Sequence, residues 1–309
     1  MSSEIINFRG DPLLKSDANV LQEIESLVNE RFKLVRQIQR SVRLGFTIKN
    51  FRISSLTINK VKMDTIPESI GNLTMLRKLE IDGNMMEMKN QFGLTKLPDS
   101  IGNLLMLKDL DLYANALVKL PESIIRLKNL RRLNLSGNYI EELPELFGRL
   151  SSLEILKLRW NKLKSLPESF GNLDKLKFLH LASNNLNLLP DSFGNLNSLE
   201  ELYLSDNHLA FLPKSIGDLS SLLLLSLTSN NLTSLPESIG SLKSLIKLDL
   251  SNTKIKSLPE SIGDLKSLRL LQLYQIPLTS IPQSIENLKR QGTTITDLYL
   301  RDYINDSES

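Results

Sequence analysis

Large aromatic, basic and histidine side chains recur at or beside alternate positions of short Leu-x-Leu segments along the 309-residue chain. None of them fills one of the leucine, asparagine, proline or glycine positions that define the repeated pattern, so stacking of the repeats does not dictate their identities. Such side chains supply stacking, cation–π contacts and ion pairs, and they dominate the binding energies of protein interfaces. The candidate partner-binding residues are Tyr113, Arg132, Lys157, Arg159, Trp160, Phe178, His180 and Tyr203.

Acidic side chains precede this group at the equivalent positions. They form a secondary acidic patch of Glu80, Asp82, Asp109 and Asp111. Exposed charges change association rates and salt dependence more than affinity. A second interpretation of both groups is an ordinary solvated surface, because exposed charges are normal on soluble proteins.

Residues for catalysis or metal binding are sparse. The chain has no cysteine and two histidines, His180 and His208, and it lacks GxxxxGK[ST], GxSxG and HExxH motifs. This composition excludes a disulfide framework, a thiolate nucleophile and cysteine-bound zinc. We therefore predict no enzymatic activity, no catalytic residue, no metal and no cofactor.

Charge and hydropathy exclude further classes of partner. Lys and Arg number 38 against 35 Asp and Glu, a net charge of +3 that does not indicate nucleic-acid binding. No apolar run is long enough to span a membrane, and the first residues do not resemble a secretory signal. We expect a cytoplasmic protein with no membrane partner.

Prolines reveal the elements that position the candidate residues. Eleven of the 12 prolines follow a leucine or isoleucine, and ten of these form one series that is spaced 23 residues apart from its second member onward. A fixed period of this length indicates a repeat solenoid in one continuous domain. These prolines are Pro67, Pro98, Pro121, Pro144, Pro167, Pro190, Pro213, Pro236, Pro259 and Pro282.

Each period follows the frame LxxLxLxxNxLxxLPxSIGxL. The Leu-x-Leu alternation predicts a short strand, and stacked repeats pair these strands in parallel. The asparagine after the strand is predicted to be buried and bonded to successive turns, since a buried amide must be paired. The proline-containing return stretch predicts a short helix or 3-10 turn, in which Phe147, Phe170 and Phe193 stack.

This frame resembles the leucine-rich-repeat family, and its LPxSIGxL variant is similar to the intracellular Ras-group-related and Scribble-type proteins and their bacterial and archaeal relatives. The resemblance covers residues 53 to about 290. It implies an α/β repeat fold, a right-handed horseshoe solenoid with a concave parallel sheet, short convex helical or 3-10 segments and an N-terminal helical cap. It also implies a protein-interaction function, with small GTPases among the partners of such proteins.

We predict three regions. Residues 1–52 form an N-terminal cap, with an amphipathic helix of about seven turns that Ser16 and Asp17 begin, followed by a short hairpin. Residues 53–290 form ten repeats. Residues 291–309 form a capping strand and a tail.

One period is eight residues longer than the others. The surplus is a methionine-rich insertion near residues 85–93. It is either a neutral rim loop or an adaptable contact surface, since methionine-rich surfaces suit protein partners.

The predicted function is a non-enzymatic, monomeric interaction module or scaffold that binds a protein on the concave face. On this hypothesis the candidate residues form one continuous strip across five repeats. The alternative is a receptor-like binder of glycan or peptide ligands through the aromatic part of the groove.

Overall fold

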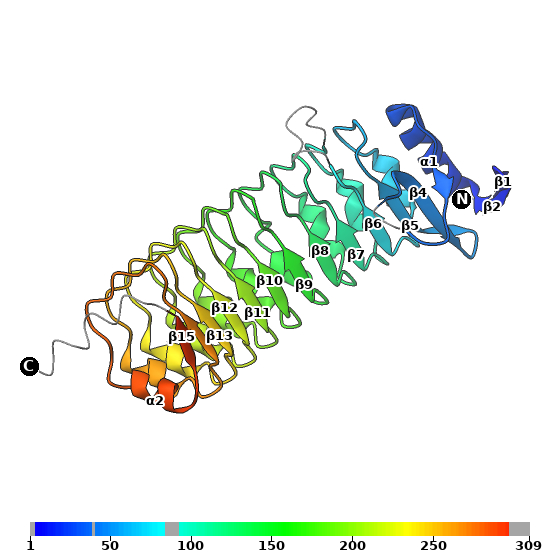
Figure 1. Cartoon of the computed structure of the whole chain (residues 1–309). Helices are drawn as coiled ribbons and strands as arrows, with labels where there is room; N and C mark the ends of the chain where they lie inside the picture. Colours follow the sequence, from blue (N-terminus) through cyan, green and yellow to red (C-terminus); the bar gives the residue numbers. More distant parts are fainter. Residues whose placement is uncertain (1–3, 39–40, 84–92, 297–309) are drawn as a thin grey trace, which may run out of the picture. The chain divides into compact units, whose positions relative to one another are not determined.

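The computed structural model describes residues 4–38, 41–83 and 93–296. The chain divides into two compact units, residues 1–162 and 163–309. Within each unit short strands from successive repeats pair side by side, and all but the last of the repeats return through a 3-10 helix (Figure 1). The predicted repeat solenoid of parallel strands and 3-10 return segments is confirmed.

The sheet of the first unit has the strand order β9-β8-β7-β6-β5-β4-β3. All neighbours pair in parallel except β4 and β5, which are antiparallel. The strands are β3 (Lys33–Leu34), β4 (Leu44–Lys49), β5 (Arg52–Ile58), β6 (Lys78–Glu80), β7 (Asp109–Asp111), β8 (Arg132–Asn134) and β9 (Ile155–Lys157). The return helices are η1 (Glu68–Asn72), η2 (Asp99–Asn103), η3 (Glu122–Arg126) and η4 (Phe147–Arg149).

The sheet of the second unit is parallel throughout, in the order β15-β14-β13-β12-β11-β10. Its strands are β10 (Phe178–His180), β11 (Glu201–Tyr203), β12 (Leu224–Ser226), β13 (Lys247–Asp249), β14 (Leu270–Gln272) and β15 (Thr294–Thr296). Its helices are η5 (Glu168–Asn172), η6 (Asp191–Asn195), η7 (Lys214–Asp218), η8 (Glu237–Ser241), η9 (Glu260–Asp264) and the α-helix α2 (Ile285–Arg290).

The core lies between the strands and the return helices. The leucines of the frame are almost all fully buried, and each contributes about 1.5–3 kcal/mol on burial. Phe170 and Phe193 stack with ring centroids 6.1 Å apart and planes 3° apart in the second unit, and Phe147 is fully buried in the first. Glycine in the return helix permits this spacing, because a Cβ at Gly194 would lie 2.3 Å from the Ser215 carbonyl oxygen.

The buried asparagines form the predicted ladder within each unit. Asn138 accepts a hydrogen bond from the Leu117 amide at 3.0 Å, and its amide group donates to the carbonyls of Leu112 and Leu135 at 3.0 and 2.9 Å. Asn115 and Asn161 do the same in the first unit, and Asn207 and Asn230 do so in the second. Each asparagine therefore binds three backbone groups and ties its own repeat to the preceding one.

The two ends of the ladder differ from each other. The first repeat has Val61 at the asparagine position, but Asn59 is buried two residues earlier and bonds the Val42 carbonyl and the Asp82 amide. Thr253 makes a single bond of 2.8 Å to the Leu250 carbonyl. The ladder therefore weakens toward the C-terminal repeats, while a displaced asparagine maintains it at the first repeat.

The N-terminal region differs from the predicted seven-turn helix. A hairpin of β1 (Ile5–Phe8) and β2 (Asp11–Leu14) precedes the helix α1 (Lys15–Val28), which ends where Asn29 adopts a left-handed conformation. Phe32 lies beyond this end, where its amide donates a hydrogen bond of 2.6 Å to the carboxylate of Glu25 in α1. The Phe32 ring packs edge-on against Phe46, with ring centroids 6.5 Å apart. Tertiary packing of Phe32 thus ends the helix, and the expectation of seven turns is wrong.

Asp17 does not cap α1 as predicted. The N-cap residue is Leu14, without a side-chain hydrogen bond. Asp17 is fully buried and accepts hydrogen bonds from the Arg52 guanidinium at 3.0 Å and from the Ile53 amide at 2.9 Å. Its carboxylate thus joins α1 to the first strand of the repeats.

Candidate binding surface

Each repeat strand has a buried central leucine, and the residues on either side of it point to the opposite face, which we call the strand face. On β8, for example, Leu133 is buried between exposed Arg132 and half-buried Asn134. This is the alternation that a pleated strand imposes. The strand positions among the candidates are Glu80, Asp109, Asp111, Arg132, Lys157, Phe178, His180 and Tyr203, and those just after a strand are Asp82, Tyr113, Arg159 and Trp160.

The candidates divide between the two units. The acidic residues, Tyr113, Arg132, Lys157, Arg159 and Trp160 belong to the first unit, and Phe178, His180 and Tyr203 belong to the second. Each unit therefore presents its own group of candidate residues, and the continuous strip across five repeats stays a prediction.

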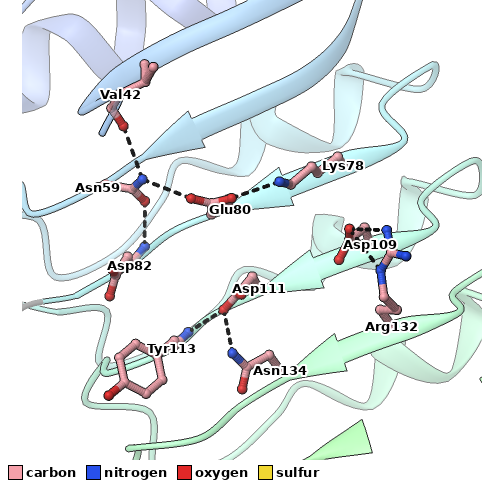
Figure 2. Close-up of polar contacts among 10 residues, drawn as sticks. All are labelled: Val42, Asn59, Lys78, Glu80, Asp82, Asp109, Asp111, Tyr113, Arg132 and Asn134. Carbon is pink, nitrogen blue, oxygen red and sulfur yellow. Dashed lines mark hydrogen bonds and ion pairs between the residues drawn. The ribbon is translucent and has the colours of Figure 1, made fainter. Parts of the chain in front are cut away.

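Polar contacts join the acidic residues of the first unit to neighbouring strands (Figure 2). Glu80 is 8% exposed and accepts hydrogen bonds from Asn59 at 3.0 Å and from Lys78 at 2.9 Å. Asn59 in turn accepts the Asp82 backbone amide at 3.0 Å. Glu80 therefore holds β6 to the preceding strand and offers little surface to a partner.

Asp109 and Arg132 form an ion pair between β7 and β8. Both Nε and Nη2 of Arg132 donate to one carboxylate oxygen of Asp109, at 3.1 and 2.7 Å. The Arg132 side chain is exposed, so this pair lies on the surface and contributes little to stability. It joins the predicted acidic and basic groups into one mixed-charge patch.

Asp111, at the end of β7, lies in surroundings that disfavour its ionised form. Its carboxylate accepts the Tyr113 amide at 3.0 Å and the Asn134 side-chain amide at 2.9 Å. Burial nevertheless raises the pKa of Asp111, with smaller increases from the negative charges of Glu80 and Asp109. At neutral pH the fold thus holds a carboxylate whose ionised form its surroundings disfavour.

We expect Asp111→Asn to stabilise the protein at neutral pH. The raised pKa means that Asp111 supports folding fully below its unfolded pKa, near 4, and that this support is lost as pH rises through the folded pKa. An asparagine oxygen still accepts both hydrogen bonds without the charge. Urea unfolding should give a gain of up to about 1 kcal/mol at pH 7 and a smaller one at pH 4.

Asp109→Asn is the matched control, because it removes a charge that Arg132 already pairs. It should give no comparable gain at pH 7. Destabilisation by Asp111→Asn that is larger at pH 7 than at pH 4 would show instead that the ionised carboxylate stabilises the fold.

Arg159 and Trp160 form a second group in the first unit. The Arg159 guanidinium lies 3.8 Å from the centroid of the Trp160 ring, which is 40% exposed. Trp160 has φ = +57°, in the left-handed region. The equivalent positions of the two preceding repeats hold Ala114 and Gly137, also at positive φ. A bulky side chain in this conformation costs about 1–2 kcal/mol.

Aromatic side chains gather on β10 and β11 in the second unit. The Tyr203 ring lies 5.0 Å from His180 and 5.5 Å from Phe178, measured between centroids. The Tyr203 hydroxyl donates to Glu201 at 2.7 Å. Burial, together with this bond and the charge of Glu201, raises the pKa of Tyr203 to about 12, so the phenol stays protonated at neutral pH.

The remaining predictions concern the insertion, metals and membranes. The methionine-rich insertion lies outside the described residues except for Gly93. Within residues 4–38, 41–83 and 93–296 there is no group of three acidic or histidine side chains placed to hold a metal ion. No helix in that part of the chain is long and apolar enough to cross a membrane.

Comparison with known proteins agrees with the repeat architecture. Residues 126–208 match the profile of a leucine-rich repeat region, and residues 198–219 and 220–275 match leucine-rich repeat profiles. A leucine-rich-repeat protein of Leptospira interrogans is 33% identical, with a TM-score of 0.72 over 86% of this chain and 70% of that one. The chain belongs to the leucine-rich-repeat family. No curated protein sequence matches it.

Two plant receptors among the leucine-rich-repeat relatives were solved with other molecules. The ectodomain of the receptor kinase GASSHO1/SCHENGEN3 from Arabidopsis thaliana, in complex with CASPARIAN STRIP INTEGRITY FACTOR 2, is 32% identical, with a TM-score of 0.66 over 79% of this chain. The plant peptide hormone receptor RGFR1, in complex with RGF2, is 28% identical, with a TM-score of 0.63 over 87% of this chain. This chain spans 29% and 45% of their lengths.

Proposed function

We propose that this leucine-rich-repeat chain is a non-enzymatic interaction module that binds a protein partner through its strand faces. Leucine-rich-repeat proteins are in general binding modules rather than enzymes, and the plant relatives above are a receptor-kinase ectodomain and a peptide hormone receptor. The resemblance of the LPxSIGxL frame to Ras-group-related proteins favours a small GTPase as the first partner to test.

Trp160 is the observation that carries this proposal. Stacking of repeats requires no tryptophan at its position, where Ala114 and Gly137 serve in the two preceding repeats of the first unit. The ring is exposed, strained and covered on one face by Arg159. In addition, Nε of Arg159 is buried without a hydrogen-bond partner in the described part of the chain. Tryptophan and arginine are the residue types most enriched at interface hot spots, so a bound partner explains features that the fold itself does not need.

We expect Trp160→Asn to weaken partner binding without weakening the fold. Asparagine tolerates the left-handed conformation, so the free energy of unfolding should stay the same or rise by about 1 kcal/mol. Loss of a hot-spot tryptophan costs about 2 kcal/mol or more of binding energy, which is roughly a 30-fold loss of affinity. Quantitative capture from native lysate identifies the partner, and calorimetry with the purified partner measures the loss.

Tyr139→Asn is the matched control for this test. The Tyr139 ring also makes a cation–π contact, with Lys162 Nζ 4.8 Å from the ring centroid. Unlike Trp160, Tyr139 follows the ladder residue Asn138 and lies off the strand face. It should leave binding unchanged. If both variants bind as the unaltered protein does, the strand face of the first unit is not the contact surface.

The aromatic group of the second unit favours a second candidate function, a receptor for peptide or glycan ligands. Phe178, His180 and Tyr203 place three rings together on β10 and β11. Aromatic faces can stack on sugars as well as on peptide side chains. A glycan array and a peptide array probed with the same labelled protein distinguish the two ligand classes.

A further inference from the structure

We propose that the second unit holds a binding site for an arginine side chain of a peptide or protein partner, formed by Phe178, His180, Glu201 and Tyr203. This inference rests on the proposed function, because it names the chemistry that a partner must present to one part of the strand face. It concerns residues of the second unit alone.

The three rings form a cluster in which they lie at large angles to one another rather than in a stack. Phe178 and His180 lie on β10, and they are in register with Glu201 and Tyr203 on β11. The planes of Phe178 and His180 meet at 87°, and the Tyr203 ring is tilted by 44° and 51° to them. All three side chains are half-buried. The negatively polarised ring faces thus lie at different angles around one small area, where they can attract a cation.

Glu201 supplies a carboxylate beside this ring cluster. Tyr203 donates to its Oε2 atom, and Oε1 has no hydrogen-bond partner within the described residues. Glu80 and Asp109 of the first unit differ in this respect, since Lys78 pairs with Glu80 and Arg132 pairs with Asp109. In the described part of the chain no lysine or arginine forms an ion pair with Glu201. A partner's cation can therefore complete the pairing of this carboxylate.

The neighbours of Glu201 on the strand face are apolar. It is in register with Phe178 on one side and with Leu224 of β12 on the other. Apolar flanks exclude water and strengthen the attraction between the carboxylate and a cation. The high pKa of Tyr203, about 12, keeps its hydroxyl a donor that fixes the carboxylate in place.

Arginine matches this combination better than other cations. Its planar guanidinium stacks on an aromatic face and still donates in-plane hydrogen bonds to a carboxylate. A lysine ammonium is a more strongly hydrated point charge, and a trimethylammonium group has no hydrogen to donate to Glu201. A ring face beside an open carboxylate oxygen therefore favours a guanidinium.

The test uses capped tripeptides as probes and the full chain with labelled phenylalanine, histidine and tyrosine rings. Acetyl-Gly-Arg-Gly-amide is titrated while ring resonances are followed by NMR, with peptides in which lysine, trimethyllysine or neutral citrulline replaces the arginine. We expect saturable shifts of the Tyr203 and His180 rings with the arginine peptide, at least about threefold weaker binding of the lysine and trimethyllysine peptides, and no binding of citrulline.

Three substitutions assign the site. Glu201→Gln should weaken arginine binding about tenfold or more, because a charge-assisted hydrogen bond is lost. Its matched control Glu200→Gln alters a neighbouring carboxylate that pairs with Lys177 at 3.8 Å, and it should change nothing. Phe178→Leu removes a ring without touching the carboxylate and should also weaken binding, so the test does not depend on one variant.

Each result either supports or overturns the arginine site. The site is wrong if the arginine peptide causes no ring shifts, or if the citrulline peptide binds equally well. It is also wrong if the trimethyllysine peptide is preferred, or if the two glutamate variants have equal effects. These outcomes are independent of the Trp160 test. If the arginine peptide does not bind while Trp160→Asn still abolishes partner binding, the arginine site is wrong and the proposed function stands. If the arginine peptide binds while Trp160→Asn leaves partner binding unchanged, the arginine site alone stands.

Discussion

Replacement of Asp17 by alanine is expected to destabilise the first unit by about 3–5 kcal/mol, because it leaves a partly buried guanidinium and a buried amide without their acceptor. The Asp17 carboxylate is fully buried, whereas the Arg52 side chain keeps 23% of its surface exposed. Arg52 also donates to the Asn72 carbonyl at 3.2 Å and to the Thr74 hydroxyl at 3.1 Å. One carboxylate thus anchors α1, β5 and the segment after η1, so its loss frees the cap from the first repeats.

Urea unfolding and hydrogen exchange measure this effect. Exchange should accelerate first at the amides of β4 and β5, since each repeat depends on its neighbours in a stacked array. Asp17→Asn keeps an acceptor for the Ile53 amide, so it should cost less than alanine. Asp99→Ala is the control, because Asp99 is exposed in η2 and should change stability by no more than about 0.5 kcal/mol. If Asp17→Ala costs no more than this control, the cap is attached by other contacts.

The repeat fold could be predicted from sequence because each repeat satisfies the same packing requirements. The leucine spacing, the buried asparagine and the Leu-Pro return stretch each predict one element, and the structure contains all three. The asparagine ladder is predictable for a further reason: a buried amide must find partners, and successive turns present the same backbone groups at each step. Asn138 and Asn207 show this in the two units.

The N-terminal region could not be predicted in this way, because it occurs once and its contacts are long-range. Phe32 continues the three-four spacing of α1, but its partners are Glu25 and Phe46. Asp17 sits where an N-cap is plausible, but its partners lie 35 and 36 residues away. Local spacing fits both a continued helix and the observed turn, and only tertiary contacts decide between them.

The sequence predicts which candidate residues lie on the strand face, but not which of them are strained, paired or buried there. Alternation along each strand is enough to place Arg132 and Phe178 on the strand face. The sequence does hold one signal that was missed for Trp160: the residue before the ladder asparagine is small or polar at Ala114, Gly137, Ser183 and Asp206, as a left-handed conformation favours. The burial of Glu80 depends on its hydrogen bond with Asn59. Asn59 does not stand at the asparagine position of the repeat frame, so the frame could not predict this burial.

A graded series at Asn207 is expected to give the second large effect. Asn207 is buried in the second unit, donates to the carbonyls of Leu181 and Leu204 at 3.0 Å each, and accepts the Leu186 amide at 3.0 Å. Asn207→Leu keeps the branching and the number of side-chain heavy atoms but leaves these three backbone groups without partners. Each unpaired buried group costs about 1–3 kcal/mol, so we expect a loss of about 3–6 kcal/mol in the free energy of unfolding.

Asn207→Thr should fall between the leucine variant and the unaltered protein. At the equivalent position of a later repeat, Thr253 keeps one bond of 2.8 Å to the Leu250 carbonyl, so a hydroxyl can satisfy one of the three groups. Asn187→Leu is the matched control, since Asn187 is exposed in the same unit. Exchange at the Leu186 amide, which bonds directly to Asn207, should accelerate most in Asn207→Leu. If the threonine and leucine variants unfold at the same urea concentration, a retained hydrogen bond adds no stability at this position and the hydrogen-bond account of the ladder is wrong.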